Sequence, residues 1–278
     1  MTITVQIKVN DGVILASDSA TTITIPTKDG GQSVINVYNN ANKLFNLVKV
    51  LPIGVGTWGN GSFGQTSIAT LAKDYRQKIS FDFKRQSYTI EQTTRELAKF
   101  LFEEHWLPAY QNSSIKPYTG FVVAGYSAGS SDAEIWHIDI GNDAQPSIYR
   151  MDTPSQPALV WNGQEDAITR LIKGYIAELP SVMKLCQVED AKISLVMEKL
   201  GAIEQPLITA PMPIQDAIDV GEFLVDLTAR YVRFRPGAPT VGGPIEVAAI
   251  TKHEGFKWIK RKHFYTSEFN QPQPERSQ

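Results

Sequence analysis

The chain has 278 residues, of which 42% are hydrophobic and 20% charged, and its formal net charge is −2. These values are ordinary for a globular protein that can bury a substantial core. The small net charge argues against a chain whose partner is nucleic acid or an anionic membrane surface.

Targeting and redox features are absent from the sequence. The longest apolar runs, such as residues 121–124 and 247–250, have the length of a strand and are far too short to span a bilayer. The first residues lack the charged and apolar regions of a signal peptide. Cys186 is the only cysteine, which excludes an intramolecular disulfide and a cysteine metal cluster. The sequence therefore predicts a cytoplasmic protein with no membrane partner.

The chain opens on a predicted β-hairpin. Residues 2–9 and 13–18 are rich in β-branched residues and flank the turn Asn10-Asp11-Gly12. Because the first strand begins directly behind Met1, we expect Thr2 to be held rigidly. Removal of Met1 would leave Thr2 with a free α-amine beside its hydroxyl, a recognised pairing of base and nucleophile.

Blocks of strands and blocks of helices follow in turn. The composition of residues 19–34 predicts a polar loop. Short strands are expected next at 34–38, 43–48 and 53–57. Apolar residues then recur at helical spacing over 63–79 and over 90–110, where Thr89 is the expected N-cap.

The second half repeats this order. The strands that we expect are 120–126, 133–140, 147–151, 158–161, 245–251 and 256–260. Helices are expected over 165–179 and 214–232, and residues 181–213 allow no clear assignment. Residues 265–278 are predicted to be a mobile polar tail.

Segregated blocks of this kind favour an α+β fold over alternating βαβ units. Two antiparallel sheets stacked face to face, each covered on its outside by a pair of helices, would bury every apolar stripe. Because no change of composition divides the chain, residues 1–264 are predicted to form one domain.

Two glycine patterns suggest other chemistry but lack its context. Gly125-x-Ser127-x-Gly129 matches a nucleophile elbow, which needs a strand that leads into a helix, whereas another strand is expected next. We interpret it as a hairpin turn. Residues 54–59 match the dinucleotide fingerprint in their letters, but antiparallel hairpins precede them and no βαβ unit follows.

Metal and nucleic-acid sites are not predicted either. None of the four histidines has a second ligand at the spacing of a metal motif, so we expect neither a metal nor another cofactor. His105 and His137 are interpreted as structural or surface residues. The basic run at 257–262 is interpreted as a solvated face.

Four stretches in the same order resemble a mature proteasome β-subunit. They are the opening residues 2–18, the lysine-containing 42–45, the strand and small-residue turn at 53–56, and the stretch from Gly242-Gly243 to Phe256. The chain therefore resembles the proteasome-type N-terminal nucleophile (Ntn) hydrolases over residues 2–260. The resemblance implies a four-layer αββα sandwich and assembly into rings.

The resemblance also implies a set of site residues. Thr2 would be the nucleophile, Lys43 would lie beside its hydroxyl, and Asp18 would pair with Lys43. The α-amine of Thr2 would carry the proton. A backbone N–H at Gly56 or Thr57 would hold the oxyanion.

The chain departs from the family in four places. The loop between Asp18 and Lys43 is longer, residues 235–241 contain no carboxylate before the Gly-Gly pair, and 181–213 has the character of an insertion. Where the family places a supporting serine, this chain has Asn162-Gly163, with Asp166 soon after. These three are candidate supporting residues. The departures indicate a divergent bacterial proteasome homologue.

The leading hypothesis is a threonine-type endopeptidase in a homo-oligomeric ring, with polypeptide as substrate and an ATP-dependent unfoldase as a candidate partner. One alternative is a catalytically inactive ring subunit, a scaffold or gate, that keeps Met1. A second alternative is an Ntn amidase that acts on small-molecule amides.

Overall fold

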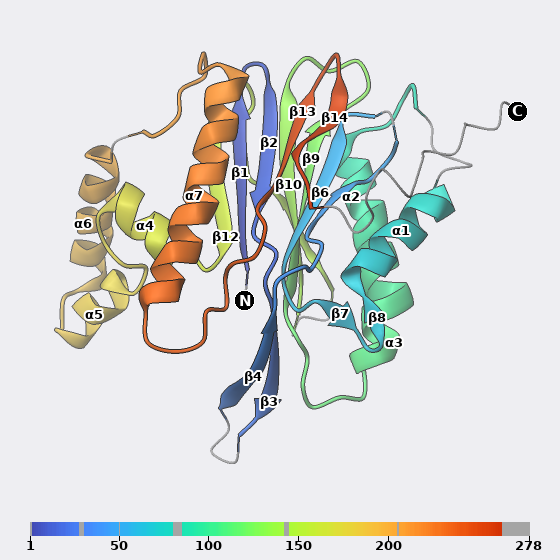
Figure 1. Ribbon diagram of the computed structural model, residues 1–278. Helices are drawn as coiled ribbons and strands as arrows, with labels where there is room; N and C mark the ends of the chain where they lie inside the picture. Colours follow the sequence, from blue (N-terminus) through green and yellow to red (C-terminus); the bar gives the residue numbers. More distant parts are fainter. Residues whose placement is uncertain are drawn as a thin grey trace, which may run out of the picture.

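The computed structural model describes residues 2–27, 31–49, 51–79, 85–141, 145–204 and 206–262. The predicted tail at 265–278 and His263 lie outside the described residues. The chain has an α+β fold built on two five-stranded antiparallel sheets (Figure 1).

The first sheet contains the opening hairpin and has the strand order β12-β1-β2-β13-β14. Its strands are β1 (Ile3–Val9), β2 (Gly12–Ser17), β12 (Ala158–Gly163), β13 (Glu246–Thr251) and β14 (Gly255–Lys260). The predicted hairpin is confirmed, because β1 pairs with β2 from Thr4 opposite Ser17 to Val9 opposite Gly12.

The second sheet has the order β11-β10-β9-β6-β5. Its strands are β5 (Leu44–Asn46), β6 (Ile53–Gly59), β9 (Thr119–Tyr126), β10 (Ala133–Ile140) and β11 (Ser147–Arg150). Antiparallel neighbours flank β6 on both sides, which is not the setting of a dinucleotide fingerprint. The interpretation of 125–129 as a hairpin turn is confirmed, since β9 pairs directly with β10.

Helices cover the outer side of each sheet (Figure 1). The first sheet packs against α4 (Asp166–Lys173) and α7 (Ile214–Phe234), and the second against α1 (Ile68–Ile79) and α2 (Ile90–Lys99). A π-helical segment, Phe100–Trp106, continues α2 into the short helix α3 (Leu107–Tyr110). A third apolar cluster joins the two sheets to each other, with Leu15 and Ile250 on one side and Leu44 and Val122 on the other.

The side chains of β1 alternate between an apolar face toward α7 and a polar face toward the second sheet. Ile3, Val5 and Ile7 belong to the cluster shared with α7. Successive side chains of a strand point to opposite faces, so Gln6 and its polar neighbours face the second sheet. Gln6 Oε1 lies 3.2 Å from Nε2 of His137, whose pKa is lowered to about 4 because the ring is buried. His137 is therefore a structural residue, as interpreted from the sequence.

Three element predictions were wrong in part. Most of the described residues of the predicted loop 19–34 belong to two paired strands, β3 (Thr21–Pro26) and β4 (Gln32–Tyr38), because β-branched residues alternate within the polar composition. The first helix begins only at Ile68, since two short strands, β7 (Ser62–Phe63) and β8 (Thr66–Ser67), precede it. The helix predicted over 165–179 ends at Lys173, where Gly174 takes a left-handed conformation (φ 74°).

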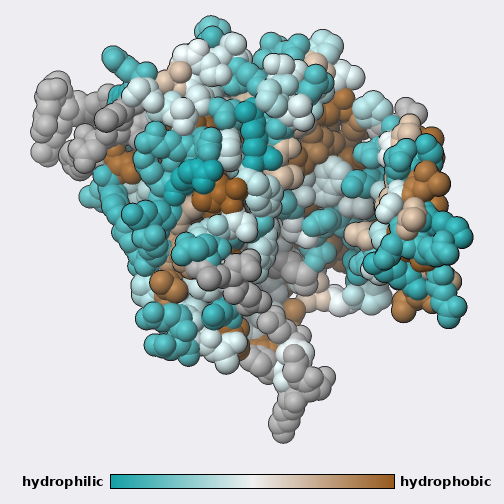
Figure 2. All heavy atoms as spheres, turned by 180° about the vertical axis from the view of Figure 1, so that it is seen from behind, coloured by the Kyte–Doolittle hydropathy of each residue, from teal (hydrophilic) through white to brown (hydrophobic). Residues whose placement is uncertain are grey.

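The unassigned stretch 181–213 contains helical structure. It includes most of α5 (Leu179–Leu185) and all of α6 (Asp190–Ala202), and Ile193 is the one buried residue of these two helices. Apolar side chains on α5 and directly after α6, such as Leu185 and Ile203, are exposed. Figure 2 shows brown hydrophobic patches on this side of the molecule, at the right of the view. No helix within the described ranges has the length and apolar character needed to cross a bilayer.

Candidate active site

Thr2 is held at the start of β1 by the end of β12. Its carbonyl oxygen accepts a 2.7 Å hydrogen bond from the backbone N–H of Gln164, and Ile3 lies opposite Gly163 in the ladder. Thr2 is only 5% exposed. The position of Thr2 therefore depends on the backbone of residues 163–164.

Gly163 has a specific steric reason to be glycine. Its φ is 102°, and a Cβ at this position would lie 2.0 Å from the carbonyl oxygen of Thr2. Of the two candidate supporting residues Asn162 and Gly163, the second thus contacts Thr2 through its backbone. Asn162 lies opposite Thr4, and its buried Oδ1 has no hydrogen-bond partner among the described residues.

Replacement of Gly163 by alanine should displace Thr2 and lower the free energy of unfolding by about 2–4 kcal/mol, because backbone strain and a steric clash add. The matched control is Gly237→Ala. Gly237 has a similar φ of 111°, but no atom lies within 4 Å of its added Cβ. Urea denaturation of both variants separates the effect of backbone strain from that of the clash with Thr2. Equal losses of unfolding free energy in the two variants would contradict the role of the Thr2 contact.

Asp18 is the residue that joins the site together. It follows β2, is fully buried, and its two oxygens accept four hydrogen bonds. Oδ1 receives the N–H of Ile3 at 3.1 Å and Nζ of Lys43 at 2.6 Å. Oδ2 receives the N–H groups of Ala20 and Gly242, each at 3.0 Å. One carboxylate oxygen therefore holds both the residue next to Thr2 and the ammonium of Lys43.

Lys43 is a buried cation directly before β5. Its side chain is 6% exposed and pairs with the fully buried Asp18. Burial lowers the pKa of Lys43 below its ordinary value, and the ion pair with Asp18 opposes this shift. The pairing of Lys43 with Asp18 that the resemblance implied is present in the structure.

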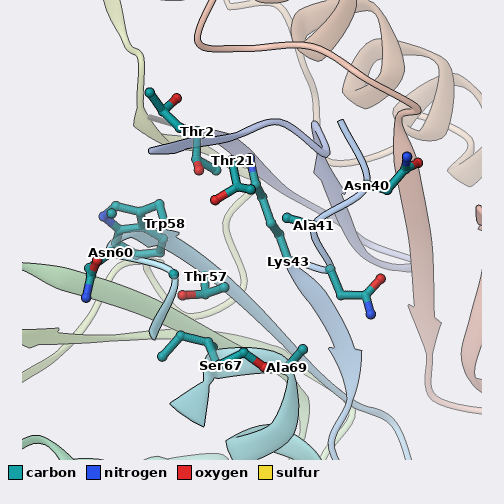
Figure 3. A pocket seen from close by; sticks show the side chains of 15 residues that line it. Thr2, Thr21, Asn40, Ala41, Lys43, Thr57, Trp58, Asn60, Ser67 and Ala69 are labelled. Carbon is teal, nitrogen blue, oxygen red and sulfur yellow. The ribbon is translucent and has the colours of Figure 1, made fainter. Parts of the chain in front are cut away.

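Thr2 and Lys43 line one cavity of about 350 Å³. Figure 3 shows Thr2 at the top of the cavity with Thr21 and Lys43 close by, and Ser67 at the bottom. The wall consists of Thr2, residues 21–22, 40–43 and 57–61 and the first residues around α1, 67–69. Lys43 is the one charged residue among the described residues of this lining. The other polar groups of these wall residues are hydroxyls, amides, the backbone and the indole N–H of Trp58, which donates to the hydroxyl of Tyr118.

The two backbone N–H groups expected to hold an oxyanion, those of Gly56 and Thr57, are both directed into the sheet. The N–H of Thr57 is already bonded to the carbonyl oxygen of Lys43 at 3.0 Å. Because N–H groups alternate between the two neighbours of a strand, that of Gly56 faces β9. The same alternation turns the N–H of Gly59 toward the side of Lys43, at the cavity wall. The N–H of Gly59 is therefore a further candidate, which the sequence did not indicate because the phase of the ladder cannot be read from it.

Asp166, the third candidate supporting residue, takes part in a different set of contacts. Its carboxylate accepts hydrogen bonds from Arg170 at 2.9 Å, from the hydroxyl of Tyr231 at 3.0 Å and from Arg235 at 3.2 Å. Asp166 is not part of the cavity wall. These contacts tie α4 to the C-terminal end of α7, which is a structural role. Among the described residues, no group of three or more His, Cys, Asp or Glu side chains is placed to hold a metal ion.

Comparison with known proteins gives one kind of match. No protein-family model and no curated protein matches this sequence. Among solved structures, the chain is similar to Anbu (ancestral beta-subunit) from Yersinia bercovieri, with a TM-score of 0.56 and 14% sequence identity over 95% of this chain and 89% of that chain. The two proteins share a fold. At this level of identity the likeness concerns the fold alone.

Proposed function

We propose that the protein is an amide-bond hydrolase, a threonine-type peptidase distantly related to the proteasome, with Thr2 as its N-terminal nucleophile after removal of Met1. The observation that carries this proposal is the double role of Asp18, whose Oδ1 binds both Lys43 and the N–H beside Thr2. The likeness to an ancestral beta-subunit supports a four-layer αββα Ntn sandwich.

In the first half of the proposed reaction, Thr2 Oγ attacks the carbonyl carbon of the substrate amide. The α-amine of Thr2, with a reference pKa of about 7.7–8.0, accepts the hydroxyl proton near neutral pH. The ammonium of Lys43 favours the developing alkoxide, and the N–H of Gly59 is the donor available to the oxyanion. As the C–N bond breaks, the proton passes to the leaving amine and an ester on Thr2 remains.

In the second half, the α-amine of Thr2 accepts a proton from water, and the resulting hydroxide attacks the ester. The C–O bond breaks, Thr2 Oγ recovers a proton, and a carboxylic acid leaves. The cavity wall offers neutral hydrogen-bonding groups, including Asn40, Asn42 and Asn60. Such groups suit the backbone of an extended peptide, so we propose polypeptide as the substrate class.

The test is the intact mass of the purified protein before and after incubation with a peptide epoxyketone, which bonds to both the hydroxyl and the α-amine of an N-terminal threonine. We expect loss of Met1 and one adduct per chain. Retention of Met1 without an adduct would contradict the catalytic proposal and favour the inactive ring subunit. A free Thr2 without an adduct would also contradict it.

A further inference from the structure

A second buried ion pair lies beside the pair of Asp18 and Lys43. Nζ of Lys262 is 2.9 Å from Oε2 of Glu246, and their side chains are 6% and 2% exposed. Glu246 is the first residue of β13, and Lys262 follows the end of β14. Because removing two charges from water costs free energy, we considered which other groups this ion pair contacts and holds in place.

The Lys262 ammonium also donates hydrogen bonds to two segments of the site. Nζ donates to the hydroxyl oxygen of Ser19 and to the carbonyl oxygen of Ala41, each at 2.7 Å. Lys262 thus has two hydrogen-bond acceptors in these segments and Glu246 as its ion-pair partner. Ser19 directly follows Asp18, and Ala41 precedes Lys43 by two residues and lines the cavity.

The two segments also bind each other. The N–H of Ala41 donates to the carbonyl oxygen of Ser19 at 2.9 Å, and the N–H of Ser19 donates to the carbonyl oxygen of Gly242. Ser19 Oγ in turn donates to the carbonyl oxygen of Pro244 at 2.6 Å. Lys262 therefore closes a network in which the segments that carry Asp18 and Lys43 are held side by side.

We propose that Lys262, with Glu246 as its counter-ion, is a positioning residue that clamps the segment carrying Asp18 to the segment carrying Lys43. Lys262 is not part of the cavity wall, so it acts through Ala41 and Ser19 and not on a substrate. The proposal rests on the proposed function only in that the site it positions is the Thr2 site.

The pair also acts on Lys43 through its charges. Among the described residues, the charged groups that act on Lys43 are Asp18 after β2, Glu246 on β13 and Lys262 after β14. Burial has the largest effect and lowers the pKa of Lys43, Asp18 raises it, Lys262 lowers it and Glu246 raises it. Loss of the Lys262 charge should therefore raise the pKa of Lys43, and loss of the Glu246 charge should lower it.

The experiment is an NMR titration of the full chain labelled with 13Cε-lysine, in which the Lys43 signal is assigned by its absence from Lys43→Arg. We expect the midpoint of Lys43 to move up in Lys262→Met and down in Glu246→Gln, each by about one pH unit, the effect of a unit charge several ångströms away. Shifts in the same direction, or no shift, would overturn the proposal.

Two further variants control for folding and for nonspecific charge effects. Lys260→Met removes a lysine at the end of β14 that pairs with the exposed Glu222 of α7, and should leave the titration of Lys43 unchanged. The double variant Lys262→Met/Glu246→Gln removes both buried charges, so the titration of Lys43 should return close to that of the parent. If Lys262→Met does not fold, the double variant and Glu246→Gln still test the proposal, because a parent-like midpoint in Glu246→Gln would overturn it.

Epoxyketone labelling adds a readout of positioning. We expect adduct formation to slow about tenfold in Lys262→Met, a loss typical of a displaced positioning group, and to recover in Lys262→Arg, which keeps the charge. Because the titration needs no activity, the two proposals fail separately. If the parent protein is not labelled, the proposed function is contradicted. If the Lys43 midpoint moves in the same direction in Lys262→Met and Glu246→Gln, or does not move, the role of Lys262 is contradicted.

Discussion

Replacement of Thr2 by alanine should abolish both epoxyketone labelling and peptide hydrolysis while the protein stays folded. The change removes the hydroxyl that attacks the carbonyl and keeps the backbone bond from Gln164 to residue 2. Loss of a nucleophile typically lowers kcat by about 10⁴–10⁶-fold. The measurement is the rate of release from a fluorogenic peptide amide, with intact mass as the second readout.

Thr2→Ser is the matched control, since it keeps both a hydroxyl and a free α-amine. We expect it to retain labelling, with a reduced rate because serine lacks the methyl group that restricts χ1 of threonine. Alanine and serine are both small, so Met1 should be removed from both variants. Hydrolysis by Thr2→Ala within tenfold of the parent rate would show that Thr2 is not the nucleophile.

Asp18→Asn should cost about 3–5 kcal/mol of unfolding free energy, because it leaves the buried ammonium of Lys43 without its counter-ion. The asparagine amide would also present N–H donors to a site where Asp18 now accepts bonds from Ile3, Ala20 and Gly242. Labelling of Thr2 should be lost with the geometry. Guanidinium denaturation followed by tryptophan fluorescence measures the first effect.

Two controls show whether burial of the pair is the cause. In the double variant Asp18→Asn/Lys43→Met the unpaired charge is gone, so the loss should be smaller than in Asp18→Asn alone. Glu91→Gln removes one partner of the exposed pair with Arg95 on α2 and should change stability by less than about 0.5 kcal/mol. A loss below about 1 kcal/mol in Asp18→Asn would contradict the buried-pair explanation.

Local patterns in the sequence determined the elements that depend on a few neighbouring residues. The opening hairpin follows from its Asn10-Asp11-Gly12 turn and its β-branched strands, and α7 follows from apolar residues at helical spacing. The segregation of strands and helices was sufficient to predict an α+β fold with antiparallel sheets. The pairing of Asp18 with Lys43 came from the family resemblance, since neither residue alone indicates the other.

The tertiary structure decided the features that depend on distant parts of the chain. The directions of the N–H groups of Gly56, Thr57 and Gly59 depend on the phase of the ladders that β6 shares with β5 and β9. Asp166 stands close to the predicted site in the sequence, but Tyr231 and Arg235 draw its carboxylate to α7. Packing of helices sets that orientation, and no local pattern encodes it.

The sequence by itself was sufficient to predict the hairpin that opens the chain, the class of fold, and the candidate residues Thr2, Asp18 and Lys43. Only the tertiary structure placed Lys262 against Ser19, which is 243 positions away in the sequence. It also showed that β3 and β4, which lie in a stretch of mostly polar composition, pair as one hairpin. The physical reason is that turn and strand propensities act over a few residues. Buried ion pairs form only when packing brings separate segments together and excludes water from both charges.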